Sequence, residues 1–274
     1  MNLSLCTITF RHHLQSLEQI AQWARLKGFD GIELWGVHAR KTPLENLNLL
    51  KSMNLNISML SDYLPLGLNR EETKSMVDQC SSLLTELNTN KLRTFAGAKA
   101  SRDLSEDERK HIVDQLRLIC ERLENKGQLL LIETHPNTLA DNLESTLRLI
   151  EEVNHPSFKI NYDALHIWES GADPILGFKL LEPYIAHVHL KNIRSREDLN
   201  VFAPNNVYSP AGSREGMVSL FEGSIDYHSF FAGLMKELEK VELSLEWFGE
   251  DVYEVLFQDL NEIRIINQSL KVHL

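Results

Sequence analysis

The sequence predicts an α/β protein, a closed (β/α)8 barrel formed as a single domain by residues 1–274. Eight short apolar segments alternate with longer amphipathic segments, which is the pattern of parallel strands joined by helices. The last unit, at 242–270, has the same form as the first, and this repetition favours a closed barrel over an open sheet. A chain of 274 residues with 43% hydrophobic residues is long enough to bury one large core.

The expected strands are short and rich in apolar residues. In chain order they lie at 3–10, 31–36, 56–63, 91–96, 128–135, 158–163, 185–191 and 242–248. Between them, apolar residues recur at helical spacing, most clearly over 76–87 and 112–123, as expected for helices that pack one face on a sheet. No G-x-G-x-x-G motif follows the first strand, which argues against a dinucleotide-binding fold.

Residues typical of helix ends mark several of these segments. Three residues with capping side chains precede a glutamate by three positions, as in a capping box: Asn69, Ser105 and Asp141. Asp173 stands directly before Pro174, and proline is favoured in the first turn of a helix. Gly28 and Gly127 stand where helices are expected to end, because glycine readily adopts the left-handed conformation found there.

Residues 193–224 interrupt the alternation of strands and helices with a long polar segment. The segment retains aromatic residues, among them Phe202 and Tyr208, which favours a packed structure over a disordered insertion. Long loops within compact domains are often functional. We therefore expect this loop to lie over the active-site face of the barrel.

The composition limits the partners and the compartment of the protein. The 28 basic and 39 acidic residues give a net charge of −11, which disfavours binding to nucleic acid. The three cysteines lie far apart and indicate no disulfide framework, so a cytoplasmic protein is expected. No segment approaches the roughly 20 apolar residues that cross a bilayer, and no membrane partner is expected. The sequence leaves the oligomeric state open, with a homo-oligomer as one option.

Polar residues stand at nearly every predicted strand end, which is the edge where (β/α)8 barrels carry their active sites. Four of them terminate otherwise apolar strands: Glu133, Asp163, His189 and Glu246. Three carboxylates buried close together repel one another unless a cation compensates them. Three carboxylates and one imidazole suit Mn²⁺ or Mg²⁺, with Zn²⁺ or Co²⁺ as alternatives through the histidine. The sequence therefore predicts a divalent-metal site at these four residues.

Further polar residues at the strand ends suggest the chemistry of the site. His135 follows Glu133 by two positions, so both side chains are expected to face the barrel mouth. There His135 is suited to remove a proton next to a metal-bound carbonyl, and a turn role before Pro136 is the alternative. Arg93 is suited to grip a substrate carboxylate or to pair with a site carboxylate. Lys191 is expected to polarise a carbonyl or hold a hydroxyl. Four aromatic residues are candidates for pocket walls, with a place in the core as the alternative for each: Trp35, Tyr63, Trp168 and Phe202.

Several motifs in the chain resemble those of one enzyme family: SDYL, RTFAG, ETHPNT, LHIWESGADP and FAPNNVY. Together with GIELWG, HVHLKN and SLEWFG, they resemble the xylose isomerase-like superfamily of TIM barrels. More narrowly, they resemble the bacterial 3-dehydroshikimate dehydratases of petrobactin siderophore biosynthesis. The resemblance runs from LCTITFRH to SLEWFG, with a short segment after GIELWG as its main departure.

This resemblance implies a metal-dependent lyase that acts on a small molecule, with the four metal ligands given above. It implies His135 as the catalytic base and a catalytic part for Lys191. The implied substrate contacts are Tyr63, Arg93, His166, Lys191 and Phe202, with Glu33 and His12 nearby. The implied reaction converts 3-dehydroshikimate to 3,4-dihydroxybenzoate (protocatechuate) and water. It proceeds through an enediolate after removal of the C4 proton and expels the C5 hydroxyl, and removal of a C6 proton is an alternative route.

Three other functions are alternatives for a barrel with these strand-end residues. A sugar or sugar-acid isomerase or epimerase would use the same metal scaffold with a different pocket. A metal-dependent endonuclease of abasic DNA would need a basic face, which the net charge of −11 disfavours. A non-catalytic binding protein would tolerate the loss of His135.

Overall fold

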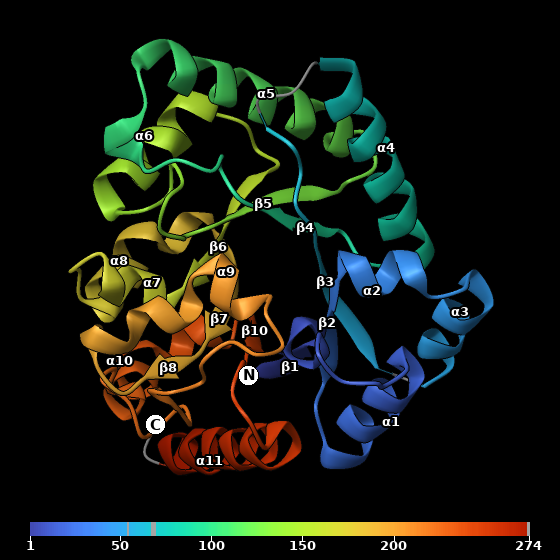
Figure 1. Ribbon diagram of the computed structural model, residues 1–274, viewed down its shortest axis with the longest axis vertical. Coiled ribbons are helices and arrows are strands. Elements are labelled where there is room, and N and C mark those ends of the chain that lie inside the picture. Colours follow the sequence, from blue (N-terminus) through green and yellow to red (C-terminus); the bar gives the residue numbers. More distant parts are fainter. Residues whose placement is uncertain (54, 67–69, 273–274) are drawn as a thin grey trace.

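The computed structural model describes residues 1–53, 55–66 and 70–272. Eight parallel strands form a closed barrel in the order β1-β10-β7-β6-β5-β4-β3-β2, and Figure 1 shows the helices arranged around it. The barrel strands are β1 (Asn2–Cys6), β2 (Gly31–Trp35), β3 (Asn56–Ser61), β4 (Lys91–Thr94), β5 (Leu129–Glu133), β6 (Phe158–Asp163), β7 (Ile185–Leu190) and β10 (Glu242–Leu245). The predicted (β/α)8 barrel is confirmed.

The strands lie where the apolar segments predict them, but several end earlier. β1 ends at Cys6 instead of residue 10, because Thr7–Phe10 form a 3-10 helix, η1. β10 ends at Leu245, so Glu246 follows the strand directly. Apolar character does not mark a strand end here, since loop residues beyond the ends, such as Phe248, are buried as well.

The helices that follow the strands cover the outside of the barrel. They are α1 (Leu17–Lys27), α2 (Gly36–Lys41), α3 (Leu44–Ser52), α4 (Arg70–Leu87), α5 (Glu106–Glu124), α6 (Leu143–Val153), α7 (Ala164–Glu169), α8 (Pro174–Leu181), α10 (Tyr227–Leu238) and α11 (Val252–Val272). The predicted stripe of α5 is buried along its whole length: Ile112, Val113, Leu116, Ile119, Cys120 and Leu123. The three cysteines are buried and unpaired. Among the described residues, no helix combines the length and hydropathy needed to cross a bilayer.

Most of the predicted helix ends are confirmed. Ser105 forms a reciprocal capping box with Glu108 at the start of α5. Asp173 caps α8 by accepting hydrogen bonds from two backbone amides, with Pro174 in the first turn. Gly28 follows α1 with a φ of 90°, and Gly127 follows α5 with a φ of 64°. These side chains and glycines satisfy the backbone groups that a helix leaves unpaired at its ends.

The prediction that Asp141 caps α6 is wrong. Asn142 caps this helix by accepting a hydrogen bond from the backbone amide of Ser145 at 2.9 Å. α6 begins one residue after Asn142, so Asp141 stands one position too early to reach the first turn. Asp141 instead accepts a hydrogen bond from the backbone amide of Ser101. The cap predicted at Asn69 lies outside the described residues.

The long 193–224 segment has an ordered structure. It contains η4 (Arg196–Phe202) and the short helix α9 (Pro204–Val207). Two short strands, β8 (Asn192–Ile193) and β9 (Met217–Val218), pair antiparallel and close its base. Figure 1 shows this orange segment on the β7 and β10 side of the barrel. A packed segment, and not a disordered insertion, therefore lies beside the strand ends.

Candidate active site

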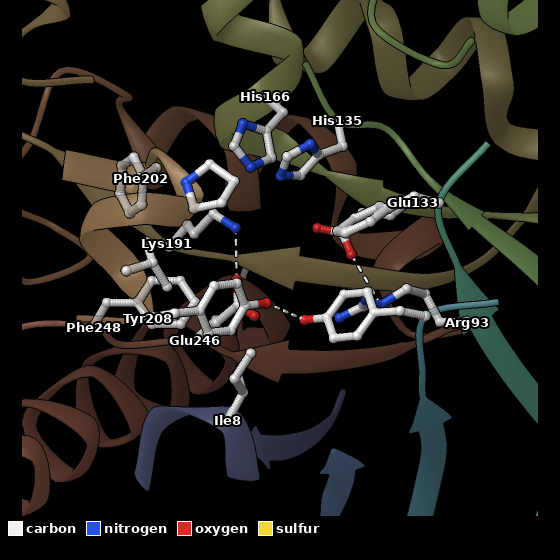
Figure 2. Close-up of a pocket in the computed structure, with 14 residues that line it drawn as sticks. Ile8, Arg93, Glu133, His135, His166, Lys191, Phe202, Tyr208, Glu246 and Phe248 are labelled. Atoms are coloured by element: carbon white, nitrogen blue, oxygen red, sulfur yellow. Dashed lines mark hydrogen bonds and ion pairs between the residues drawn. The ribbon is translucent and has the colours of Figure 1, made fainter. Parts of the chain in front are cut away.

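The carboxyl ends of the barrel strands surround a cavity of about 440 Å³. Its lining residues are Ile8, Tyr63, Arg93, Phe95, Glu133, His135, His166, Lys191, Phe202, Pro204, Val207, Tyr208, Glu246 and Phe248. Figure 2 shows His135 and His166 on one side of this cavity, with Tyr208, Phe248 and Ile8 on the opposite side. The two histidines therefore face Ile8 and Phe248 across the cavity.

The four predicted metal ligands converge at the base of this cavity. Glu133 ends β5 and Asp163 ends β6, while His189 lies in β7, directly opposite Asp163 in the strand register. The His189 Nδ1 atom lies 3.5 Å from Glu133 Oε1, 3.8 Å from Asp163 Oδ2 and 4.0 Å from Glu246 Oε2. All four side chains are buried. The barrel thus brings one nitrogen and three carboxylate oxygens together.

The orientation of His189 is set from below by a buried carboxylate. Its Nε2 atom lies 2.8 Å from Glu33 Oε2, and because a carboxylate oxygen accepts, Nε2 carries the proton and donates. In the neutral imidazole that a metal ligand requires, the lone pair of the ring lies on Nδ1, the atom that faces the three carboxylates. Burial acts to lower the pKa of His189, but Glu33 and the neighbouring carboxylates raise it well above its usual value. The surrounding charge strongly favours a cation at this point.

Two buried cationic side chains partly compensate the carboxylates. Lys191 Nζ lies 2.7 Å from Asp163 Oδ2 and 2.6 Å from Glu246 Oε2, and Arg93 Nε lies 3.0 Å from Glu133 Oε2. Burial acts to raise the pKa of Glu133, but Arg93 and His189 hold it well below its usual range. The carboxylate of Glu133 is therefore ionised.

The residues fit a divalent cation by charge and by one unpaired ring nitrogen. Four buried carboxylates, of Glu33 and the three predicted acidic ligands, face the two cations Arg93 and Lys191. With neutral histidines, this arrangement leaves two negative charges uncompensated. Within the described part of the chain, His189 Nδ1 is buried without a hydrogen bond, and such an atom requires a partner. Two overlapping groups here have the spacing of a metal site: Glu133, Asp163 and His166, and Asp163, His189 and Glu246.

His135, the predicted base, stands beside this cluster as a neutral imidazole. Its Nδ1 atom lies 2.8 Å from the Pro136 carbonyl, and since a carbonyl only accepts, Nδ1 donates and Nε2 holds the lone pair. Burial, together with the nearby His166, lowers the pKa of His135 to about 3. The ring packs between Phe95 and His166, with centroid distances of 4.4 Å to each. The imidazole is therefore neutral and held in one orientation at the cavity wall.

Five of the predicted substrate contacts line the cavity: Tyr63, Arg93, His166, Lys191 and Phe202. Arg93 also makes the ion pair with a site carboxylate that the sequence leaves open as its alternative role. His166 is held by a 2.7 Å hydrogen bond from its Nδ1 atom to Glu169 Oε2. The two predicted wall residues Trp35 and Trp168 lie outside the lining of the cavity.

Glu33 and His12 also lie outside the cavity lining, although substrate contacts were predicted for them. Glu33 is fully buried beneath the cluster, where it accepts from His189 and Ser61, so other side chains separate it from the cavity. His12 is exposed, and its Nε2 atom lies 3.0 Å from the Val207 carbonyl. The structure therefore places one residue under the site and the other outside it.

The chain matches a known family along most of its length. The family model described as xylose isomerase-like TIM barrel matches residues 21–272. The chain belongs to the xylose isomerase-like TIM-barrel family. The resemblance seen in the sequence motifs is thereby confirmed at the level of the family.

Relatives of this xylose isomerase-like protein include a Bacillus anthracis protein named 3-dehydroshikimate dehydratase. The two are 47% identical over 283 aligned positions, which cover 99% of each chain. The crystal structure of the probable 3-DHS dehydratase AsbF of B. anthracis, involved in petrobactin synthesis, superposes with a TM-score of 0.91 over 96% of this chain and 99% of the other, at 47% identity. An L-ribulose 3-epimerase shares the fold, with a TM-score of 0.78 at 16% identity over 99% of this chain and 96% of its own.

Several residues that line the cavity were missed as site residues in this xylose isomerase-like barrel: Ile8, Phe95, Pro204, Val207, Tyr208 and Phe248. Phe95 and Tyr208 belong to the motifs RTFAG and FAPNNVY. These motifs carry the family resemblance, and they could have identified both residues as site residues. The Tyr208 hydroxyl lies 2.6 Å from the Tyr63 hydroxyl, which joins the long loop to the end of β3. Ile8 and Phe248 look like ordinary core residues in the sequence, so no signal marked them.

Proposed function

We propose that this protein is a 3-dehydroshikimate dehydratase, a hydro-lyase that converts 3-dehydroshikimate to 3,4-dihydroxybenzoate and water. The observation that carries the proposal is the 47% identity over 99% of the chain to the B. anthracis protein of that name. The geometry agrees, since a neutral base stands beside a cluster suited to a cation. The participation of that relative in petrobactin synthesis supports siderophore biosynthesis as the pathway. The three unpaired cysteines agree with a place in the reducing cytoplasm.

Glu133, Asp163, His189 and Glu246 would hold a divalent metal ion. Three oxygen ligands and one nitrogen favour Mn²⁺ or Mg²⁺, with Zn²⁺ or Co²⁺ as alternatives. When bound, such an ion draws electron density from the substrate carbonyl and so acidifies the proton on the adjacent carbon. Glu33 supports this role by keeping the proton of His189 on Nε2, away from the site.

His135 is proposed as the base that removes the C4 proton next to the C3 ketone. Its Nε2 lone pair accepts the proton, and the electrons of the broken C–H bond form an enediolate. The enediolate then expels the C5 hydroxyl, which leaves as water after taking up a proton. Transfer of a C6 proton to the ketone oxygen completes the aromatic catechol. Removal of the C6 proton first, through the conjugated system, remains the alternative order.

The two cationic side chains have complementary parts in this proposal. Arg93 would hold the C1 carboxylate of the substrate, since its guanidinium is suited to two parallel hydrogen bonds. Lys191 lies on the opposite side of the cluster, beside Glu246, where its ammonium group would donate to a substrate oxygen or to the departing hydroxyl. Tyr63, His166 and Phe202 line the cavity between them, and the 193–224 loop would cover the substrate.

The direct test is incubation of the metal-free protein with Mn²⁺ and 3-dehydroshikimate, followed by chromatography for 3,4-dihydroxybenzoate. We expect the catechol to accumulate with added metal and to stop accumulating when a chelator is added. Glu246→Gln should lower metal occupancy and turnover together, because it removes one anionic ligand. Turnover of ketose sugars without any catechol would instead support a sugar isomerase or epimerase and would reject the dehydratase.

A further inference from the structure

Arg11 follows η1 near the mouth of the barrel, and its guanidinium contacts three separate segments. The Nε atom donates to the Val207 carbonyl at 2.7 Å, in the long loop. The Nη1 atom lies 3.5 Å from the Ile8 carbonyl, just after β1. The guanidinium carbon stands 4.5 Å from the ring centre of Phe248, which follows β10. One side chain therefore joins segments that are up to 240 positions apart.

All three contacted residues line the candidate active-site cavity, although Arg11 itself does not. Ile8, Val207 and Phe248 also belong, with Cys6, to a buried apolar cluster that is separate from the main core. Figure 2 shows Ile8 and Phe248 together with Tyr208 on one side of the cavity, opposite His135. We call Ile8, Val207 and Phe248 the apolar wall.

The placement of Arg11 is not explained by an ion pair. Among the residues that the structure describes, no carboxylate lies within ion-pair distance of its guanidinium, and its Nη2 atom is buried without a hydrogen bond. A buried donor that lacks a partner destabilises a protein by about 1–3 kcal/mol. The contacts that Arg11 does make go to the three residues of the apolar wall.

We propose that Arg11 is a positioning residue that holds the apolar wall against the substrate in the reaction proposed above. The small apolar cluster that contains the wall buries little surface. The hydrogen bonds and the cation–π contact of Arg11 therefore help to keep its residues packed together. The ring centre of Phe248 lies 5.7 Å from Lys191 Nζ, so the apolar wall adjoins a predicted catalytic residue. Displacement of Phe248 would therefore loosen the binding of the substrate beside Lys191. This inference rests on the proposed function.

Arg196 lies in the 193–224 loop that Arg11 contacts, and it offers a matched control. Its guanidinium also donates to two backbone carbonyls, of Trp168 and Glu169, and stands 4.1 Å from the ring centre of Trp168. Neither of these residues lines the cavity. Arg196→Ala therefore removes the same kinds of contact as Arg11→Ala, but away from the apolar wall.

The experiment compares Mn²⁺-loaded wild type, Arg11→Ala and Arg196→Ala by steady-state kinetics with 3-dehydroshikimate and by hydrogen exchange of the full chain. For Arg11→Ala we expect KM to rise about tenfold or more with a smaller change in kcat, because a wall contact acts on bound substrate and transition state alike. Amides of residues 205–209 should exchange faster, and metal affinity should stay unchanged. Millimolar guanidinium should restore KM in Arg11→Ala, and Arg196→Ala should behave as wild type in KM.

An Arg11→Ala protein with wild-type KM and wild-type exchange at 205–209 would overturn the inference. So would equal increases of KM in both variants, because that result indicates general loosening of the loop. If the wild-type protein releases no 3,4-dihydroxybenzoate, the proposed function fails. In that case the exchange comparison decides alone whether Arg11 holds the apolar wall.

Discussion

The imidazole of His189 donates from Nε2 to the buried Glu33 carboxylate at 2.8 Å, and this bond turns Nδ1 toward three other carboxylates. Glu33 comes from β2 and His189 from β7, so the barrel joins them across its interior. His187 lies beside them, 3.4 Å from the same Glu33 oxygen, and burial lowers its pKa to about 4. Both histidines therefore contact Glu33, and the shorter contact is the one to His189.

Glu33→Gln should weaken metal binding without removing a metal ligand. The amide is a weaker acceptor than the carboxylate and lets His189 turn, and loss of such supporting bonds typically lowers metal affinity about 10- to 100-fold. Titration of the metal-free protein with Mn²⁺ measures the change. Asp62→Asn is the control, because Asp62 is also a buried carboxylate beside a strand end but pairs with Arg40. Equal Mn²⁺ affinity in wild type and Glu33→Gln would contradict the proposed support.

His135→Ala should abolish most of the turnover and leave metal content unchanged. A general base contributes typically 10²- to 10⁴-fold to a rate, and His135 lies beside the cluster without being one of its four predicted ligands. Product formation and metal content, measured on the same preparation, check this expectation. A variant that keeps wild-type turnover would support a non-catalytic binding protein, and one that loses its metal would place His135 among the ligands.

Lys191→Met should bind the divalent metal more tightly while losing activity. Lys191 Nζ contacts Asp163 and Glu246 at 2.7 and 2.6 Å, so its removal leaves three uncompensated negative charges in the cluster instead of two. The attraction for a divalent cation then rises, and we expect the affinity for Mn²⁺ to increase about tenfold. Calorimetric titration with Mn²⁺ measures it, and Lys191→Arg, which keeps the charge, is the control. Weaker binding to Lys191→Met would show that the lysine orders the ligands instead.

Asp259 should make the stability of the fold depend on pH. Burial raises the pKa of this carboxyl, in α11, from 3.8 to about 7, although it accepts a hydrogen bond from the Leu220 amide at 3.0 Å. Between about pH 4 and 7 the folded protein therefore holds a proton that the unfolded chain has released, and stability falls as pH rises through this range. Asp259→Asn keeps the acceptor and loses the titration.

Urea unfolding at pH 5 and pH 8 tests this expectation for Asp259. Relative to Asp259→Asn, the wild type should lose about 2–3 kcal/mol of unfolding free energy between the two pH values. Parallel changes in both proteins would show that Asp259 does not titrate in this range. The readout is independent of the metal site, because α11 packs outside the barrel.

Much of the site was predictable because barrel active sites lie at one edge. Glu133, Asp163, His189 and Glu246 each lie within one residue of the end of an apolar strand, and strands of one barrel meet at the same rim. The alternation of side chains along a strand also places His135 on the same side as Glu133. Local periodicity and the direction of the chain are sufficient for these expectations.

Other features depend on contacts that no local pattern contains. Glu33 is an acidic residue near the end of an apolar strand, as Glu133 is at the cavity. In the structure, however, β2 places Glu33 beneath His189. His12 was expected near the substrate, and the loop instead brings the Val207 carbonyl to its ring. Asp141 has the spacing of a helix cap, yet the helix begins one residue later than that spacing implies.

The sequence by itself determined the barrel and the family, and it predicted the four residues that meet beside the cavity, because periodicity and motif spacing are local properties of the chain. Only the tertiary structure decided which side chains enclose the cavity, and it added Phe95, Tyr208 and Phe248 to the site. Phe248 looks like an ordinary core position in the sequence, and no periodicity distinguishes Phe95 or Tyr208 as a cavity residue. Their role comes from the closure of the barrel and the packing of a distant loop, which bring together residues separated by long stretches of chain.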